Sequence, residues 1–266
     1  MRHTTKRKKK LYGTDAKLDS ITLYYQKIAA EKFVALSVET RYCLLVMGHI
    51  HDELNWIQRM AFLATRELNF RQQVLRSGQM MQCLMLARLF FGKLLEFSTL
   101  LTPQNSPLRT FIAENFRPED IEAGKSQVNE LLGLFEAEKW IRLGRNKHFM
   151  HYPTLNDVRA TLDDAQIQWD LEIYHGKMSN NTLYPTSDVM TNYAWLRLAN
   201  PEAPMDGLGD ALDVLRSMSA LSLSTLEQSI GYFVDRNLMP LSENEPIKLN
   251  VPNYKDRGLS YFLSLK

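Results

Sequence analysis

Cysteine is almost absent from this chain, since Cys43 and Cys83 are its only two among 266 residues. Two cysteines without a C-x-x-C spacing do not supply the four ligands of a thiolate metal site. Both lie in apolar, helix-like stretches of the sequence. We therefore predict two buried free thiols and no redox or metal centre built on cysteine.

Long apolar runs are also missing. The longest apolar stretch, 83–97, is interrupted by Arg88, Lys93 and Glu96, whereas a membrane span needs about 20 apolar residues. The basic N-terminus lacks the apolar core and small-residue cleavage site of a secretory signal. The sequence therefore predicts a cytoplasmic chain with no contact to a membrane.

Several catalytic templates have no counterpart in the chain. There is no G-x-G-x-x-G, G-x-x-x-x-G-K-[ST], G-x-S-x-G or H-E-x-x-H pattern, which argues against the commonest nucleotide-binding, hydrolase and metalloprotease sites. His49 and His51 would point about 200° apart on a helix and could not chelate one ion. We predict no metal and no cofactor, and we expect His51 at a core edge or an interface.

Charge is distributed unevenly along the chain. Residues 1–10 hold six of the 32 Lys and Arg and no acid, which leaves 26 basic against 30 acidic residues elsewhere. We interpret residues 1–15 as a flexible basic tail. Such a tail can be merely solubilising, or it can lower the cost of approaching nucleic acid by neutralising phosphates.

Proline is absent before Pro103, and from about Leu18 to Leu101 the pattern is helical almost throughout. Apolar residues recur there at three- or four-residue multiples, which predicts long helices that face a core. One stripe consists of Leu44, Met47, His51, Leu54 and Ala61, and the other of Met80, Leu84, Ala87, Phe91, Leu94 and Leu101.

Further elements are predicted after Pro103. We expect a short helix near 108–116, a helix capped by Ser126 that continues into residues 144–153, and a last long helix over about 210–236. Between them, alternation over 167–173 and the turn residues that follow predict a small β-hairpin, and Ser187 is expected to cap a helix through Leu198. Residues 240–266, with three prolines, are predicted to be an irregular C-terminal tail.

The sequence GRNKHFMHYP at residues 144–153, called the motif segment below, combines basic and imidazole side chains. Pro153 disfavours helical geometry at the preceding residue, so we expect the helix to end near His151. An imidazole beside the unpaired carbonyls of a helix C-terminus favours its protonated form and can donate a proton. Arg145 can bind two phosphate oxygens at once, and Asn146 adds an amide. Such a set suits RNA cleavage, in which the substrate's own 2′-OH attacks.

Residues 145–151 resemble the R-polar-x(3–5)-H signature of HEPN domains, with Arg145, Asn146 and His151 at the three defined positions. The resemblance implies an all-α, antiparallel helical bundle, here over residues 16–239, with 156–205 as an insertion that contains the hairpin. It implies a homodimer in which two copies of the motif share one cleft. Arg145 would bind the scissile phosphate, His151 would be the general acid or base, and Asn146 would orient them.

A second likeness lies in residues 89–96, which are similar to the G-K-L-x-E helix that packs near the motif in that family. It suggests that Glu96, or Asp52 or Glu53, orients the catalytic pair, with His148 and Tyr152 as accessory contacts. The implied function is a metal-independent endoribonuclease of the abortive-infection (phage-defence) or toxin type. Its implied partners are RNA, a second copy, and an antitoxin or regulatory protein.

Other interpretations of the same residues stay open. The chain could be a non-catalytic HEPN-like module that binds RNA, a nucleotide or a partner protein. Alternatively, Arg145 pairs with Glu138 while His148 and His151 cap carbonyls. Methionines 80, 81 and 85 are expected to fill the core, or else to form a dimer interface. Core packing is likewise favoured over base stacking for the aromatics Trp169, Tyr174, Tyr184, Tyr193 and Trp195.

Overall fold

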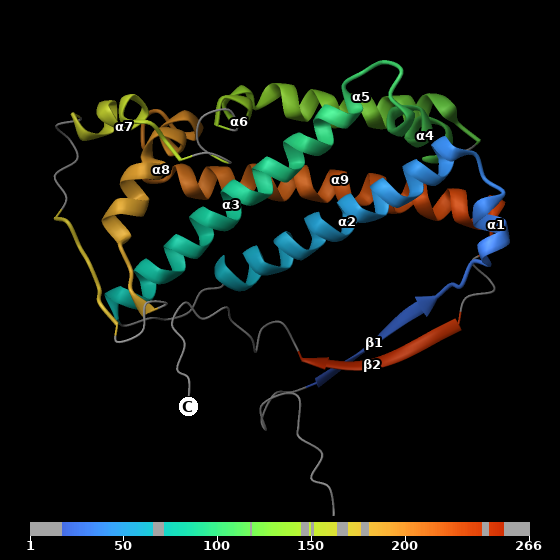
Figure 1. Cartoon of the computed structure of the whole chain (residues 1–266), viewed down its shortest axis with the longest axis horizontal. Helices are drawn as coiled ribbons and strands as arrows, with labels where there is room; N and C mark the ends of the chain where they lie inside the picture. Colours follow the sequence, from blue (N-terminus) through green and yellow to red (C-terminus); the bar gives the residue numbers. More distant parts are fainter. Residues whose placement is uncertain are drawn as a thin grey trace, which may run out of the picture.

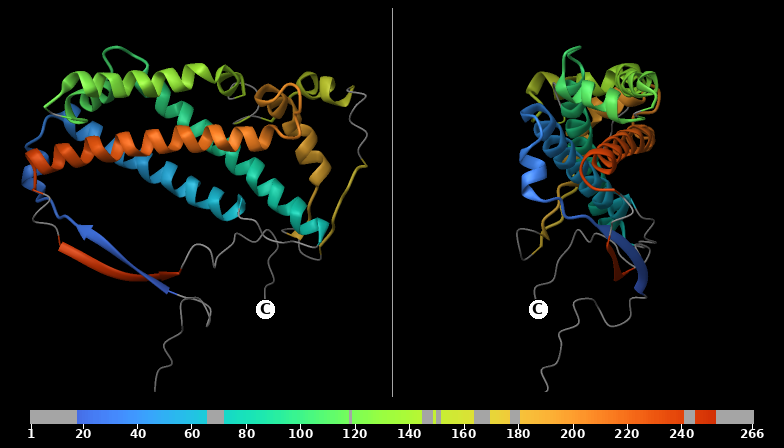
Figure 2. Two further views of the ribbon diagram at one scale, coloured as in Figure 1. Left: turned by 180° about the vertical axis from the view of Figure 1, so that it is seen from behind. Right: turned by 90° about the vertical axis from the view of Figure 1, so that its right-hand side faces the viewer.

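A computed structural model describes residues 18–65, 72–117, 119–144, 149, 152–163, 170–176, 181–240 and 245–252. The predicted all-α bundle is confirmed (Figure 1). Its frame consists of three long helices, α2 (Val38–Thr65), α3 (Gln73–Leu101) and α9 (Gly207–Asn237). Helix α2 packs along both α3 and α9, and from behind α9 is seen to lie across the bundle (Figure 2).

Most residues of the predicted apolar stripes lie in the core of this frame, with Met80 as the exposed exception. Met47 and Leu54 on α2 are fully buried, as are Phe91, Leu94 and Leu101 on α3. The stripes of α2 and α3 face one another, so the burial of their apolar surface is the main contribution to the stability of these two helices. Shorter helices cover the rest of this core: α1 (Ala30–Val34), α4 (Pro107–Asn115), α5 (Ile121–Ala137), α6 (Lys139–Gly144), α7 (Leu155–Leu162) and α8 (Pro185–Ala199).

Two helix starts differ from the prediction. Helix α5 begins after Asp120, whose carboxylate accepts a hydrogen bond from the amide of Ala123 at 3.1 Å, so Ser126 lies inside the helix and does not cap it. Helix α8 begins with Pro185, not after Ser187. Aspartate is a favourable N-cap, and proline is favoured in the first turn of a helix. Each therefore starts its helix upstream of the serine that was predicted as the cap.

The chain ends form a sheet that the sequence did not lead us to expect. Strand β1 (Leu18–Tyr25) pairs antiparallel with β2 (Glu245–Pro252), with Leu18 opposite Pro252 and Tyr25 opposite Glu245. The prediction of helix from Leu18 was therefore wrong, as was that of irregular structure within 245–252. Helix α1 and the end of α9 lie at the same end of the bundle (Figure 1). There Lys32 Nζ on α1 donates to the carbonyl of Leu238, directly after α9, at 2.7 Å and joins the first helix to the last.

The hairpin predicted within the insertion is reduced to one pairing. Tyr174 and Leu183 exchange two backbone hydrogen bonds of 2.9 Å, which makes an isolated antiparallel bridge. Residues 167–169, the first part of the predicted strand, lie outside the described residues. No described helix is both long and apolar enough to cross a membrane.

Helix α5 offers a matched pair of glycines for testing the packing. A Cβ at Gly124 would overlap the backbone of Ala113 on α4, whereas one at Gly133 would meet no described atom within 4 Å. We expect Gly124→Ala to lower the free energy of unfolding by about 1–3 kcal/mol, because backbone must move. Gly133→Ala should raise it by about 0.5–1 kcal/mol through helix propensity. Urea unfolding measures both, and equal effects would contradict the close approach of α4 and α5.

Candidate functional site

The helix that leads into the motif segment is interrupted. Helix α5 ends at Ala137, Glu138 leaves helical geometry with φ −92° and ψ 64°, and α6 ends at Gly144. The prediction of one helix from Ser126 to about His151 was therefore wrong. The Glu138 carboxylate accepts a hydrogen bond from Trp140 Nε1 at 2.7 Å, which fixes the break.

Arg145, Asn146 and His151, and the accessory His148, lie outside the described residues. The structure does describe Phe149, in the middle of the motif segment, and Tyr152 at its end. These two residues show which part of the bundle the segment borders.

Phe149 anchors the motif segment to the bundle. Its side chain is buried and stacks on Phe91 of α3, with ring centroids 5.3 Å apart. Trp195 of α8 meets the Phe149 ring edge-on, with ring centroids 5.7 Å apart. Trp140 of α6 meets the Phe91 ring edge-on, with centroids 5.0 Å apart. A Cβ at Gly144 would clash with the Phe149 ring, so this close approach requires glycine at the end of α6. Four aromatic rings thus connect α3, α6 and α8 around the segment.

Arg88 connects α3 to the backbone of the same segment. Arg88 lies one turn before Phe91 on α3, and its Nη2 donates to the carbonyl of Phe149 at 3.4 Å. The buried Nε atom of Arg88 has no hydrogen-bond partner among the described residues. This Nε atom is closed to solvent, so an anion can be bound only by the guanidinium donors that face the pocket lined by Arg88.

A pocket of about 530 Å³ lies beside the anchored segment. We call it the Arg88 pocket. Tyr152, at its edge, is 94% exposed, and aromatic rings at such positions can stack on bases. The pocket is lined by Met81, Gln82, Leu84, Met85, Arg88 and Leu89 of α3, by Phe149 and Tyr152, and by Asp188 and Asn192 of α8.

Asp188 supplies the negative charge in this pocket. Burial raises the pKa of its carboxyl group, and the nearby Arg88 guanidinium opposes that rise. Conversely, burial lowers the pKa of Arg88, and the electrostatic interaction with the Asp188 carboxylate counters that effect. The pocket therefore holds a cation and a carboxylate in a partly desolvated space, where each interacts more strongly than in water.

The framework behind Asp188 is rigid. Asn192, one turn along α8, donates from Nδ2 to the Asp188 carbonyl at 2.7 Å and accepts from Trp195 Nε1 at 2.7 Å. Trp195 is fully buried and belongs to the aromatic cluster that holds Phe149. The same cluster thus positions both sides of the Arg88 pocket.

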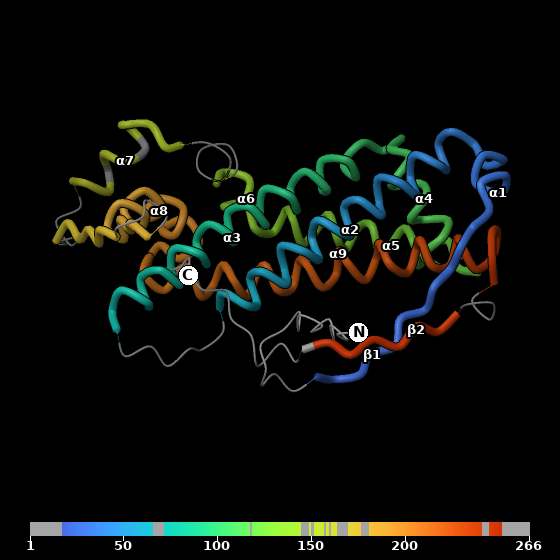
Figure 3. Tube along the Cα trace, turned by 60° about the horizontal axis from the view of Figure 1, so that its bottom comes forward, coloured from blue at the N-terminus to red at the C-terminus, as the bar shows by residue number. Residues whose placement is uncertain are grey.

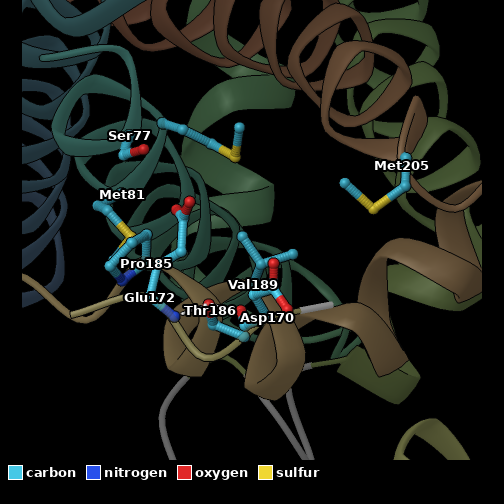
Figure 4. Close-up of a pocket in the computed structure, with 9 residues that line it drawn as sticks. Ser77, Met81, Asp170, Glu172, Pro185, Thr186, Val189 and Met205 are labelled. Atoms are coloured by element: carbon cyan, nitrogen blue, oxygen red, sulfur yellow. Dashed lines mark hydrogen bonds between the residues drawn. The ribbon is translucent and has the colours of Figure 1, made fainter. Parts of the chain in front are cut away.

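A second pocket, of about 270 Å³, adjoins the first through Met81, which lines both. In Figure 4, Ser77 and Met81 lie across this pocket from Met205, with the 170–172 segment at its side. The part of its lining that the structure describes contains the carboxylates of Asp170 and Glu172 and no basic side chain. Such a lining repels phosphate, so the Arg88 pocket is the better candidate for a nucleic-acid substrate.

Sequence reasoning missed both charged residues of the Arg88 pocket. Arg88 was noted only as an interruption of an apolar run, and Asp188 was not considered. Arg88 lies inside an apolar helix, where burying an unpaired charge is costly. A charge at such a position suggests a partner or a ligand, and this was the signal in the sequence that could have identified Arg88. Asp188 offered none, because an acid in a first helical turn is ordinarily explained by the helix dipole.

Other predicted site residues lie apart from the Arg88 pocket. Glu96 is not among the described residues that line it, and its carboxylate pairs with Lys93 Nζ at 3.3 Å. Lys93 also pairs with Glu53 at 3.2 Å, which joins α3 to α2. Within the described ranges, no three His, Cys, Asp or Glu side chains gather as metal ligands. Cys43 and Cys83 are buried free thiols, as predicted, and burial raises the pKa of each to about 11.

The methionine and aromatic predictions are confirmed in part. Met81 is buried, whereas Met80 and Met85 are 40% and 68% exposed, so core filling was wrong for those two. Tyr193 and Trp195 are core residues, as favoured, but Tyr184 is exposed. Trp169 lies outside the described residues.

Comparison with known proteins adds no relative. No protein-family model matches the chain, and neither the curated proteins nor the solved structures contain a match.

Proposed function

We propose that this chain is a HEPN-like, metal-independent endoribonuclease whose reaction centre is the motif segment beside the Arg88 pocket. One observation carries the proposal: Phe149, within the Arg–His motif, is buried against α3 at a pocket that contains a half-buried arginine. The all-α bundle agrees with the fold that the HEPN resemblance implies. A pocket with one cation, one carboxylate and an exposed tyrosine suits a single-stranded nucleotide.

The proposed reaction needs no nucleophile from the protein. The 2′-oxygen attacks the adjacent phosphorus, the bond to the 5′-oxygen breaks, and the products carry a 2′,3′-cyclic phosphate and a 5′-OH. His151 transfers a proton, as the general acid or base. Arg145 stabilises the charge that develops on the phosphorane, and Asn146 orients the pair. Arg88 binds a neighbouring phosphate, a role that the sequence alone did not suggest.

The biological setting of the proposal is taken from the resemblance alone. Two copies of the motif segment would meet in one homodimeric cleft, and an antitoxin or regulatory partner would hold the activity in check. The enzyme would act in the cytoplasm, on RNA, in phage defence or as a toxin.

The test is incubation of the purified chain and of its Arg145→Ala variant with total RNA. We expect cleavage by the wild-type chain alone, with both proteins equally helical by circular dichroism. Binding of RNA by both proteins without cleavage by either would replace the enzyme with the non-catalytic binding module. An Arg145→Ala variant that cleaves at the wild-type rate would remove Arg145 from the site.

A further inference from the structure

Helix α2 has a second apolar face, opposite the one that builds the core. Val38, Leu45 and Trp56 are 67%, 62% and 65% exposed, and Tyr42 is 41% exposed. Figure 1 shows the middle of α2 in front of α9 with no other element drawn over it, and Figure 3 shows α2 beside α3 and α9. An exposed Trp and Leu aligned on one helix mark an interaction surface more strongly than scattered apolar residues do.

The exposed residues on this face follow a heptad pattern. Successive members are alternately four and three residues apart, and at 100° per residue they fall within an arc of about 100°. We call this set the α2 seam. It consists of Val38, Tyr42, Leu45, His49, Asp52, Trp56, Arg59 and the half-buried Leu63.

The α2 seam is complementary to itself when reversed. Two antiparallel copies of α2 can be related by a twofold axis that passes between Ile50 and His51. Each seam residue of one copy then faces the partner's seam residue that lies equally far from this axis along the helix. Leu45 then packs on the partner's Trp56, and His49 faces the partner's Asp52.

The remaining seam layers fit in the same register. Tyr42 meets the partner's Arg59, a pair that allows a cation–π contact, and Val38 meets the partner's Leu63. Every layer therefore joins an apolar side chain to an apolar one, an imidazole to a carboxylate, or a guanidinium to an aromatic ring.

A parallel pairing lacks this complementarity. It would set Asp52 against the partner's Asp52, and Arg59 against the partner's Arg59, which places like charges in a desolvating seam. Within the chain, His49 Nε2 lies 3.8 Å from Glu53 Oε1, and Asp52 Oδ1 lies 3.7 Å from His51 Nδ1. The side chains of His49 and Asp52 are still 72% and 89% exposed, so both can also contact a partner. Charge complementarity thus selects one orientation and one register.

We infer that two copies of this chain associate through the α2 seam as an antiparallel helix pair. The inference goes beyond the proposed function, because no seam residue belongs to the motif segment or to the described lining of the Arg88 pocket. It also names a different surface from the motif-to-motif cleft that the HEPN resemblance implies. An isologous dimer of this kind contains each seam layer twice, related by the twofold axis.

The test uses sedimentation equilibrium of the full chain and two seam variants. We expect the wild-type chain to dimerise, and Leu45→Lys or Trp56→Glu alone to weaken dimerisation at least about 30-fold, as for loss of an interface hot spot. Mixing the two variants should restore a one-to-one dimer, because the introduced lysine of one copy then faces the introduced glutamate of the other. The matched control, Leu45→Lys mixed with Val38→Glu, should show no gain in association over Leu45→Lys alone, because the two introduced charges do not face one another.

The outcomes separate this inference from the enzymatic proposal. A monomeric wild-type chain, or variants that dimerise like wild type, would overturn the α2 seam. Variants that dissociate but fail to rescue each other would overturn its register. An unchanged circular dichroism spectrum and a cooperative thermal transition establish that the variants fold, as expected for exposed positions. Whether the wild-type chain cleaves RNA is a separate readout that none of these results determines.

Discussion

Replacing His151 with alanine is expected to slow RNA cleavage by about 10²–10⁴-fold, the usual contribution of one general acid or base. The physical reason is that no other group at the centre would supply the proton on the same trajectory. RNA affinity should change little, because Arg145 and Arg88 hold the phosphates. Single-turnover cleavage of one labelled oligonucleotide, together with its binding by fluorescence anisotropy, measures the two effects separately.

His148 provides the matched control for this prediction. It is another histidine of the motif segment, three residues earlier in the chain, and His148→Ala should lower the rate much less. Added imidazole should restore part of the activity of a His151→Gly variant, because free imidazole can occupy the vacated space and move the proton. If His151→Ala and His148→Ala lose activity equally, and both lose helical structure, the histidines are structural.

The second large effect is expected at Phe91. Phe91→Ala should lower the free energy of unfolding by about 3–5 kcal/mol, because a fully buried ring leaves a cavity that the bundle cannot refill. The loss should be at the upper end of this range, since Phe91 also stacks on Phe149 and meets Trp140 edge-on. Urea unfolding followed by circular dichroism provides the measurement.

The control for Phe91 lies on the same helix. Met85 is 68% exposed, so Met85→Ala should cost less than about 0.5 kcal/mol. RNA cleavage should also fall in Phe91→Ala under conditions where the variant remains folded, because Phe91 holds the motif segment at the pocket. An unfolding midpoint of Phe91→Ala that matches that of Met85→Ala would contradict the packing of the aromatic cluster.

The helices could be predicted because their signal is local. On α3, apolar residues from Leu84 to Leu101 repeat with the period of a helix, and the same residues are buried in the structure. Likewise α9, expected over about 210–236, spans Gly207–Asn237. In both helices the side chains that define the period also build the core, so pattern and packing agree.

The terminal ribbon was not predicted, because its pairing is not local. Ile21 and Leu23 alternate with polar residues in β1, as do Ile247 and Leu249 in β2. Each run is short, and its partner lies more than 200 residues away in the chain. A pattern of period two identifies a strand, but only the fold of the intervening bundle brings these two strands together.

The candidate site shows the same division between local and non-local signals. The motif segment was recognisable from its own residues, and Tyr152 was predicted as an accessory contact and lines the pocket. Asp188 joins Arg88 only because α8 packs on α3, a contact between segments about 100 residues apart. Residue spacing along the chain contains no information about that contact.

The measurement that tests the central claim most directly is the chemistry of the RNA ends that the purified wild-type chain produces in excess EDTA. We expect cleavage that EDTA does not inhibit, with 2′,3′-cyclic phosphate on one fragment and 5′-OH on the other. Both ends should be absent when the His151→Ala variant is used. Cleavage that EDTA abolishes, or products with 5′-phosphate and 3′-OH, would contradict the proposed attack by the 2′-oxygen.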